Sequence, residues 1–144
     1  MAQVSFKDVD KILGQLIGVI EDRKREIMEP VEKIIVEDTR LRFKLGVDPQ
    51  GRPWAPLKEA TLRSRRRKGR QDQPVLSDSR TLRNSIESSS TNDEVIIGTN
   101  VEYAKYHQEG TSRMPQRKIL GLSESVRRRI RSLIQRVLRE KGKA

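Results

Sequence analysis

Hydrophobic residues recur along the first third of this chain at the spacing of two amphipathic helices. The first helix is predicted up to about residue 26, with apolar side chains at Phe6, Val9, Leu13, Leu16, Ile17 and Ile20. Ser5 lies three residues before Asp8, and the pair resembles the capping box that begins a helix, with Asp in place of Glu. The second helix is predicted to end near Gly46, with apolar side chains at Val31, Ile34, Ile35, Leu41 and Phe43. Because proline lacks the backbone N–H that a helix interior needs, we expect Pro30 in the first turn of this second helix.

The second half of the chain combines short strand patterns with one more helix. Leu82 and Ile86 alternate with polar neighbours, and a β-branched run at 94–99 follows a Ser-Thr-Asn-Asp turn. Residues 80–99 therefore predict an antiparallel hairpin, and residues 101–107 a helical turn after it. Ser123 is the expected N-cap of the last helix, whose apolar stripe consists of Val126, Ile130, Leu133, Ile134, Val137 and Leu138.

These elements predict an α+β fold in one domain, 1–144. Its expected parts are a helical N-terminal part (5–46), a basic loop (62–75), a β-hairpin with an anchor motif (79–122) and a C-terminal helix (123–141). The chain has no cysteine, which excludes disulfides and thiolate metal sites. It also has no apolar run of about 18 residues, and residues 1–12 lack the order of a signal peptide. We expect no membrane contact and assembly in the cytoplasm.

Pro49 and Gly51 predict a turn, and Pro53 and Pro56 stiffen the chain on either side of Trp54. A sole tryptophan between prolines is typical of a side chain that fills the core under a loop.

The net charge of +11 resides in the second half of the chain, because acidic and basic side chains balance over residues 1–62. Residues 63–74 begin with six basic side chains in eight positions and contain no apolar residue, which predicts an exposed, mobile loop. Two interpretations stay open, a solvated loop and a contact with a polyanion. The basic residues available for such a contact are Arg63, Arg65, Arg66, Arg67, Lys68, Arg70, Arg127 and Arg128.

Both tyrosines, Tyr103 and Tyr106, lie beside the single histidine, His107, in a chain with only 3% aromatic residues. Nucleophilic catalysis needs a nucleophile, a base and a group that orients the base, and no nucleophile turn accompanies His107. One histidine cannot anchor a metal site alone, and the phosphate- and dinucleotide-binding fingerprints are absent. Binding of single-stranded nucleic acid needs aromatic residues among the basic ones, and the basic run has none. We therefore expect a packing anchor, with no catalytic residue, cofactor or metal.

Four blocks of sequence occur in a defined order: DPQGRPWAPL (48–57), LSDSRTLRNSI (76–86), VIIGTNVEYAKYHQEG (95–110) and MPQRKILGLS (114–123). Together they resemble the phage virion morphogenesis family, the tail-completion proteins of Mu-like and related tailed phages, over roughly residues 6–140. The resemblance implies a small α+β protein that is structural and not an enzyme. It also implies assembly as a ring at the head–tail junction or the head-proximal end of the tail, where the protein joins tails to filled heads.

Position by position, the residues that match the family motifs are Asp48, Pro49, Gly51, Trp54, Gly98, Thr99, Tyr103, Ala104, His107, Gln108, Gly110, Met114, Pro115, Arg117, Leu120 and Gly121. Two departures stand out. Lys118 and Ile119 replace the Pro and Phe of the family pattern. Arg80 follows Ser79 where the pattern has Gly, which makes Arg80 a plain strand residue in the predicted hairpin.

The resemblance and the charge asymmetry lead to an expected mechanism. Identical copies form a closed ring, six-fold like the tail, through head-to-tail contacts. The loops 63–74 and 110–118 touch neighbouring copies or adjoining neck, connector and tail proteins of the virion. Some of the excess Arg and Lys side chains face a channel that carries DNA. Two alternatives remain: a free, non-specific nucleic-acid-binding protein that uses the basic loop and the last helix, and an assembly chaperone that leaves before maturation.

Overall fold

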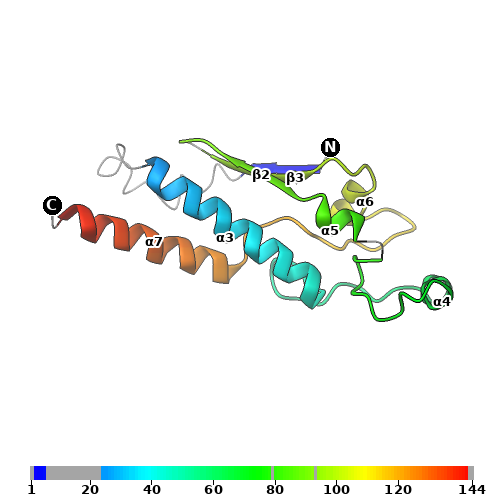
Figure 1. Cartoon of the computed structure of the whole chain (residues 1–144). Helices are drawn as coiled ribbons and strands as arrows, with labels where there is room; N and C mark the ends of the chain where they lie inside the picture. The colour runs from blue at the N-terminus through cyan, green and yellow to red at the C-terminus, as the bar shows by residue number, and fades with distance from the viewer. Residues whose placement is uncertain (1, 6–23, 79, 93, 143–144) are drawn as a thin grey trace.

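A three-stranded sheet lies over one long helix, and a second long helix runs beside the first on the side away from the sheet (Figure 1). The computed structural model describes residues 2–5, 24–78, 80–92 and 94–142. Its elements, in chain order, are β1 (Ala2–Ser5), α3 (Lys24–Leu45), α4 (Glu59–Arg67), α5 (Thr81–Asn84), β2 (Glu87–Ser90), β3 (Val95–Thr99), α6 (Ala104–Glu109) and α7 (Glu124–Gly142). The predicted α+β class is confirmed.

The sheet has the order β1-β3-β2, and both pairs of strands are antiparallel. The β2–β3 hairpin is confirmed, with Glu87 opposite Gly98 and Ser90 opposite Val95. Strand β1 was not predicted, because its pairing with β3 joins segments more than ninety residues apart, as in Ala2 opposite Thr99. Ser5 ends this strand, and the helix expected after it lies outside the described residues over 6–23.

Pro30 lies inside α3 and not in the first turn of a separate helix, so that prediction was wrong. Apolar side chains on both sides of it are buried against the rest of the core: Ile27, Met28, Val31 and Ile35. An interior proline costs about 3 kcal/mol, whereas each buried side chain of this size contributes roughly 1.5–3 kcal/mol. Burial of one continuous face therefore outweighs the lost hydrogen bond.

The end of α3 agrees with the prediction near Gly46. Gly46 takes φ +70°, and the backbone N–H groups of Gly46 and Val47 both donate to the Arg42 carbonyl, at 2.8 and 3.3 Å. This left-handed cap suits glycine, which has no Cβ to clash. Leu41, however, is 49% exposed, contrary to its predicted place on the apolar face.

The core fills the space between the sheet, α3 and α7. The expected N-cap of α7 is confirmed, because the Ser123 hydroxyl accepts a hydrogen bond from the Val126 N–H at 3.1 Å. The apolar stripe of α7 is buried at Val126, Ile130, Leu133, Ile134 and Val137. Among the described helices, none has both the length and the apolar character that crossing a bilayer requires.

The stretch predicted as a mobile basic loop is helical over its first part, as α4. Arg65 points inward from this helix and is only 4% exposed. Its guanidinium donates to the carbonyls of Gln73, Pro74 and Val75 at 2.6–3.0 Å. One buried arginine therefore holds the basic stretch in place, because it supplies hydrogen-bond donors to the backbone carbonyls of the segment that follows α4.

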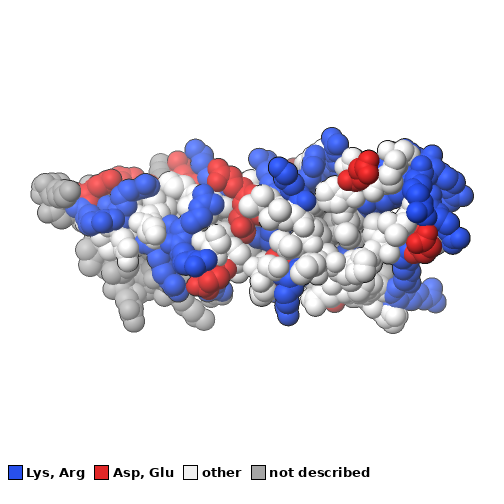
Figure 2. All heavy atoms as spheres, turned by 90° about the horizontal axis from the view of Figure 1, so that it is seen from below, with Lys and Arg blue, Asp and Glu red and all other residues white. Residues whose placement is uncertain are grey.

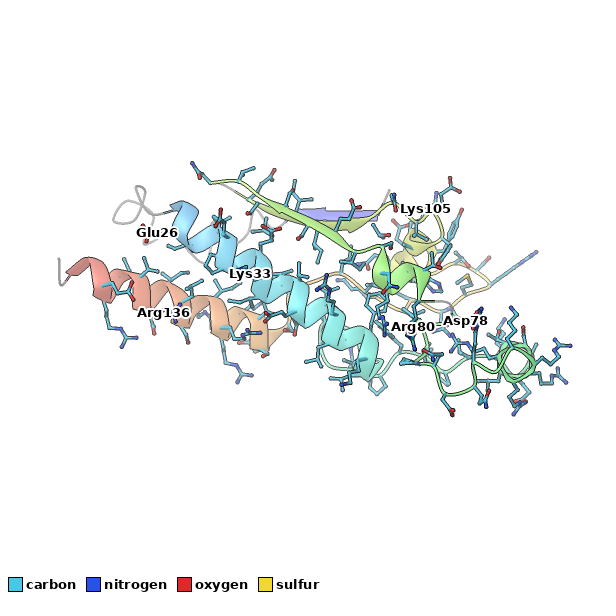
Figure 3. All side chains as sticks on the ribbon, viewed as in Figure 1. Glu26, Lys33, Asp78, Arg80, Lys105 and Arg136 are labelled. Atoms are coloured by element: carbon cyan, nitrogen blue, oxygen red, sulfur yellow. The ribbon has the colours of Figure 1, made fainter. Side chains whose placement is uncertain are left out.

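Residues 81–84 form the helical turn α5, not the start of a strand. Arg80, immediately before it on the segment that joins α4 to α5 (Figure 3), has φ +63°. The expectation of a plain strand residue at Arg80 was therefore wrong. A side chain in this left-handed conformation costs roughly 1–2 kcal/mol, and a glycine, which the family pattern has here, adopts it freely.

We expect the substitution Arg80→Gly to stabilise the protein. Glycine removes the cost of the left-handed conformation at this position, and this gain is larger than the conformational entropy that glycine adds to the unfolded chain. The free energy of unfolding therefore rises by up to about 1 kcal/mol. Urea denaturation followed by circular dichroism measures the change. The matched control Arg83→Gly, inside α5, is expected to lower stability by about 1 kcal/mol. A loss of stability in Arg80→Gly as large as in the control would contradict the strain argument.

Candidate assembly site

The family-like block at 95–110 consists of β3 and the chain that leaves it. Gly98 and Thr99 are the last two residues of β3, and the Thr99 hydroxyl accepts a hydrogen bond from the Val101 N–H at 3.1 Å. The same hydroxyl is hydrogen-bonded to the Ser85 hydroxyl after α5. The chain therefore leaves the sheet at a fixed point and enters α6, whose first residue, Ala104, is buried.

The tyrosines of this block are not buried as a packing anchor would require. Tyr103 and Tyr106 are each 44% exposed. The Tyr103 ring stands edge-on to the His107 ring with 6.1 Å between centroids, and the Lys105 ammonium lies 5.1 Å above the Tyr106 ring. The two tyrosines therefore do not supply buried rings to the predicted packing anchor.

His107 is half-buried. Burial, followed by the nearby positive charge of Arg117, lowers the pKa of His107 below its usual value of 6.5. The ring is thus neutral at neutral pH, and its buried Nδ1 has no hydrogen-bond partner within the described structure. Of the described residues, no three His, Cys, Asp or Glu side chains are placed to hold a metal ion.

Gln108 is the side chain that fastens the following loop. Its Oε1 accepts hydrogen bonds from the N–H groups of Ile119 and Leu120, both at 2.9 Å, and its Nε2 donates to the Leu120 carbonyl at 2.9 Å. One side chain thereby satisfies three backbone groups of a buried segment that is neither helix nor strand. The Arg117 N–H adds a fourth bond, to the His107 carbonyl at 2.7 Å.

The block at 48–57 forms a tight turn and a buried plug. The Asp48 carboxylate accepts hydrogen bonds from the N–H groups of Gln50 and Arg52, and Gly51 takes φ +82° in the turn. Trp54 is 5% exposed, and its indole N–H donates to the Lys118 carbonyl at 2.9 Å. The first block is thereby tied to the fourth.

Gly121 and Pro49 form a second tie between these blocks. A Cβ on Gly121 would lie 2.8 Å from the Pro49 Cγ, closer than two such carbon atoms approach. The backbone at Gly121 therefore packs directly on the proline ring, and any larger residue would separate the two blocks. Ile119, where the family pattern has Phe, is buried, and so is the neighbouring Leu120.

Two buried arginines complete these ties, and sequence reasoning did not single out either for this role. Arg42 of α3 donates to the carbonyls of Ile119 and Gly121 and forms an ion pair with Asp38. Arg117 donates to the carbonyls of Ala55 and Pro56, at 2.8 and 3.0 Å. Burial is the main cause that lowers the pKa of both guanidinium groups. The sequence signal for Arg117 was its match to a family motif, and the signal for Arg42 was its position seven residues after Ile35, on the same face of α3.

The loop after α6 carries exposed residues on a fixed base. Gly110 has φ +74°, and a Cβ there would lie 3.0 Å from the Gln116 backbone nitrogen, so only glycine fits. Met114 and Pro115 of this loop line a cleft of about 430 Å³ together with residues of α4, α5 and α6. The cations around this cleft are Lys58, Arg65, Arg80, Arg113 and Arg117.

The predicted basic contact residues fall into two surfaces and one exception. Arg63, Arg66, Arg67 and Lys68 are exposed on or just after α4, whereas Arg65 is buried and cannot meet a partner. The guanidinium of Arg70 forms an ion pair with the Asp78 carboxylate, with 3.6 Å between nitrogen and oxygen. Arg128 is exposed on α7 and Arg127 half-buried. Figure 2 shows Lys and Arg gathered at the α4 end and along α7, with a less charged band between them.

We expect Gln108→Ala to lower the free energy of unfolding by about 2–4 kcal/mol, because it leaves buried backbone donors without partners. The matched control is Gln116→Ala in the same loop, which removes one exposed hydrogen bond, to the Gln108 carbonyl, and should change stability by less than about 0.5 kcal/mol. Fluorescence of Trp54, the sole tryptophan, reports unfolding of this region. Equal effects of the two substitutions would show that Gln108 does not hold the loop.

Comparison with known proteins gives a consistent result. The sequence model of the phage virion morphogenesis family matches residues 4–139. A curated relative, the Mu-like prophage FluMu G protein 1 of Haemophilus influenzae, is 28% identical over 117 residues, which cover 81% of this chain and 80% of the relative. No solved structure matches this chain. The family match extends over nearly the whole chain and includes all four blocks tied together above, so the protein belongs to the phage virion morphogenesis family.

Proposed function

We propose that this protein completes the phage tail and joins it to the filled head, as a closed ring at the neck or the head-proximal end of the tail. Membership of the virion morphogenesis family gives it a structural role in building the virion. The finer assignment is supported by one structural observation. The side chains of the family motifs are engaged in holding loops together within the chain.

The motif side chains act on backbone groups of the same copy. The Asp48 carboxylate, the Trp54 indole and the Gln108 amide each bind backbone N–H or carbonyl groups. A catalytic group must instead meet a substrate with a free nucleophile, acid or base. The motifs therefore build a rigid scaffold, which favours a structural protein over an enzyme.

A ring needs two different contact surfaces on each copy, because head-to-tail contacts are heterologous. Such contacts form a closed ring only when the rotation from one copy to the next returns to the first copy. The outer part of the loop at 110–118 and the α4 end supply exposed surfaces on fixed bases. The six-fold symmetry of tails makes six copies the expected number. Other neck, connector and tail proteins would then meet the two faces of the ring.

DNA that passes the neck would meet arginines on the outer face of α7. Exposed side chains there are Arg128, Arg131, Arg136 and Arg139, whereas the exposed Arg129 forms an ion pair with Glu37 of α3. Arg136 extends away from α3 in Figure 3, on the face opposite the buried apolar stripe. Phosphate contacts from such a surface are independent of sequence and weaken with salt, which suits a conduit.

Loss of the gene from the phage or prophage that encodes it is expected to leave filled heads and tails unjoined. Electron microscopy of the lysate counts joined particles, and the wild-type gene supplied in trans should restore them. Mass spectrometry of purified virions should detect the protein. Normal joining without the gene would overturn the proposal, and restored joining with no protein in finished particles would identify an assembly chaperone.

The exposed arginines of α4 and α7 also favour a second candidate, a free nucleic-acid-binding protein. Light scattering of the purified protein, with and without a short DNA duplex, separates the two. The ring proposal predicts a particle near six times 16.6 kDa, or a monomer that oligomerises on partners, and in both cases little stable DNA binding. A monomer with micromolar duplex affinity and a steep loss of affinity with salt would favour the second candidate.

A further inference from the structure

The cleft between α4, α5, α6 and the loop after α6 combines apolar and positively charged side chains. Its volume of about 430 Å³ lies within the range of roughly 300–1,000 Å³ that is typical of ligand pockets. The apolar side chains that line it include Leu57, Leu76, Leu82 and Met114. A ligand of this cleft therefore needs an apolar part as well as a charged one.

The charged side chains that line the cleft are almost all positive. They comprise one carboxylate, Asp78, and five cations: Lys58, Arg65, Arg80, Arg113 and Arg117. Figure 3 places Asp78 and Arg80 on the segment between α4 and α5. Asp78 is already engaged in ion pairs, with Arg65 at 3.7 Å and with Arg70 at 3.6 Å. Glu102 and Glu109, the acidic residues closest to α6 in sequence, do not line the cleft. Five cations against one carboxylate leave a net charge of +4 on its lining.

Arg117 is a buried positive charge without an acidic partner. It is 6% exposed, and it forms no ion pair with any described residue. Its Nε and Nη2 donate to the carbonyls of Ala55 and Pro56, whereas its Nη1 donates to no described group. Burial, followed by the positive charge of Arg65, lowers the pKa of Arg117, so the two cations repel each other. Because buried charges are normally paired, the cleft lacks a negative group at this point.

We propose that this cleft binds a segment of another virion protein in which an Asp or Glu side chain lies next to an apolar side chain. The carboxylate pairs with Arg117 and with the exposed Arg80 and Arg113, and the apolar side chain packs on the leucines of the lining. This inference rests on the proposed assembly role and names the chemistry of one partner in it.

The lining distinguishes such a segment from other anions. An inorganic anion would leave the apolar side chains uncovered. The phosphates of a DNA duplex belong to a wide, stiff double helix, whereas Arg117 is nearly enclosed and can be reached only by a side chain that enters the cleft. A second copy of this chain is disfavoured, because copies that each carry a net charge of +11 repel one another.

Methionine methyl groups report on the cleft directly. Of the three methionines, Met114 lines the cleft and Met28 is buried in the core. The full-length protein, isotope-labelled at its methionine methyl groups, is titrated with the capped tripeptide Leu-Glu-Leu and followed by NMR. We expect a saturable shift of the Met114 signal and no shift of the Met28 signal. The matched peptide Leu-Gln-Leu should bind about tenfold more weakly, because its amide lacks the charge that pairs with arginine.

Neutral substitutions at the exposed cations of the cleft test the charge argument. Lys58→Gln combined with Arg80→Gln should weaken binding of Leu-Glu-Leu about tenfold and leave the weaker binding of Leu-Gln-Leu nearly unchanged. Both side chains are exposed, so the buried hydrogen bonds of Arg65 and Arg117 stay intact. The matched control is Arg136→Gln, an exposed cation on α7 outside the cleft (Figure 3), which should not affect binding. Circular dichroism checks that each variant is folded.

Three results would overturn the inference. The first is a Met114 signal that does not move with Leu-Glu-Leu, and the second is equal affinity for the two peptides. The third is a Met114 shift by inorganic phosphate or by a short DNA duplex at the same concentration as the peptide. That shift would assign the cleft to a small anion or to DNA.

An array of short overlapping segments of all virion proteins of the same phage, this chain included, identifies the partner. We expect the full-length protein to bind segments of another protein that combine an acidic and an apolar residue, and the Lys58→Gln, Arg80→Gln variant to lose them. Binding to segments of this chain alone would overturn the assignment to a different protein. Normal head–tail joining after loss of the gene would instead overturn the proposed function, whereas the Met114 shift would stand.

Discussion

Buried arginines that donate to backbone carbonyls hold this fold together. The segments at 46–58 and 110–123 are neither sheet nor long helix, yet they pack against the core and carry polar groups that need partners. Arg42 supplies donors to the second segment, and Arg117 ties the second to the first. A guanidinium presents five donors in one plane, so one side chain can satisfy several carbonyls. Burying each charge is costly, and that cost is offset by the bonds formed.

The same device sets which surfaces face outward. Arg65 turns inward and fixes the chain after α4, so the remaining basic side chains of that helix stay at the surface. Gln108 performs the corresponding task beside α6 with an uncharged amide. Because the polar tie is made by Gln108, the neighbouring tyrosines need not be buried. The tyrosine rings at α6 are therefore partly exposed.

A structural protein of this size can combine a rigid scaffold with several contact surfaces because its core is compact. The sheet, α3 and α7 bury most of the large apolar side chains in one cluster. The C-terminal end of α3 carries Leu41 and Leu45 at the surface, outside that cluster. The α4 end and the outer face of α7 carry the excess positive charge (Figure 2). The proposed assembly contacts and the proposed DNA contacts would thus use different parts of one chain.

The sequence by itself determined the elements whose signals are local. The apolar stripe of α7 with its Ser123 cap, the glycine at the end of α3 and the β2–β3 hairpin all depend on residues a few positions apart. The four motif blocks also determined the family, because order and spacing are properties of the sequence. Burial of Trp54 followed from its place between prolines.

Only the tertiary structure decided the features that depend on distant partners. The position of Pro30 inside α3 follows from burial against the sheet and α7, and strand β1 exists through its pairing with β3. In the sequence Arg65 cannot be told apart from its basic neighbours, and it is buried because the fold brings the carbonyls of residues 73–75 within hydrogen-bond distance of it. The exposure of the α6 tyrosines likewise depended on which side chain, Gln108, reached the loop. Periodicity reports the face of one element, whereas the partner that meets that face is set by packing of the whole chain.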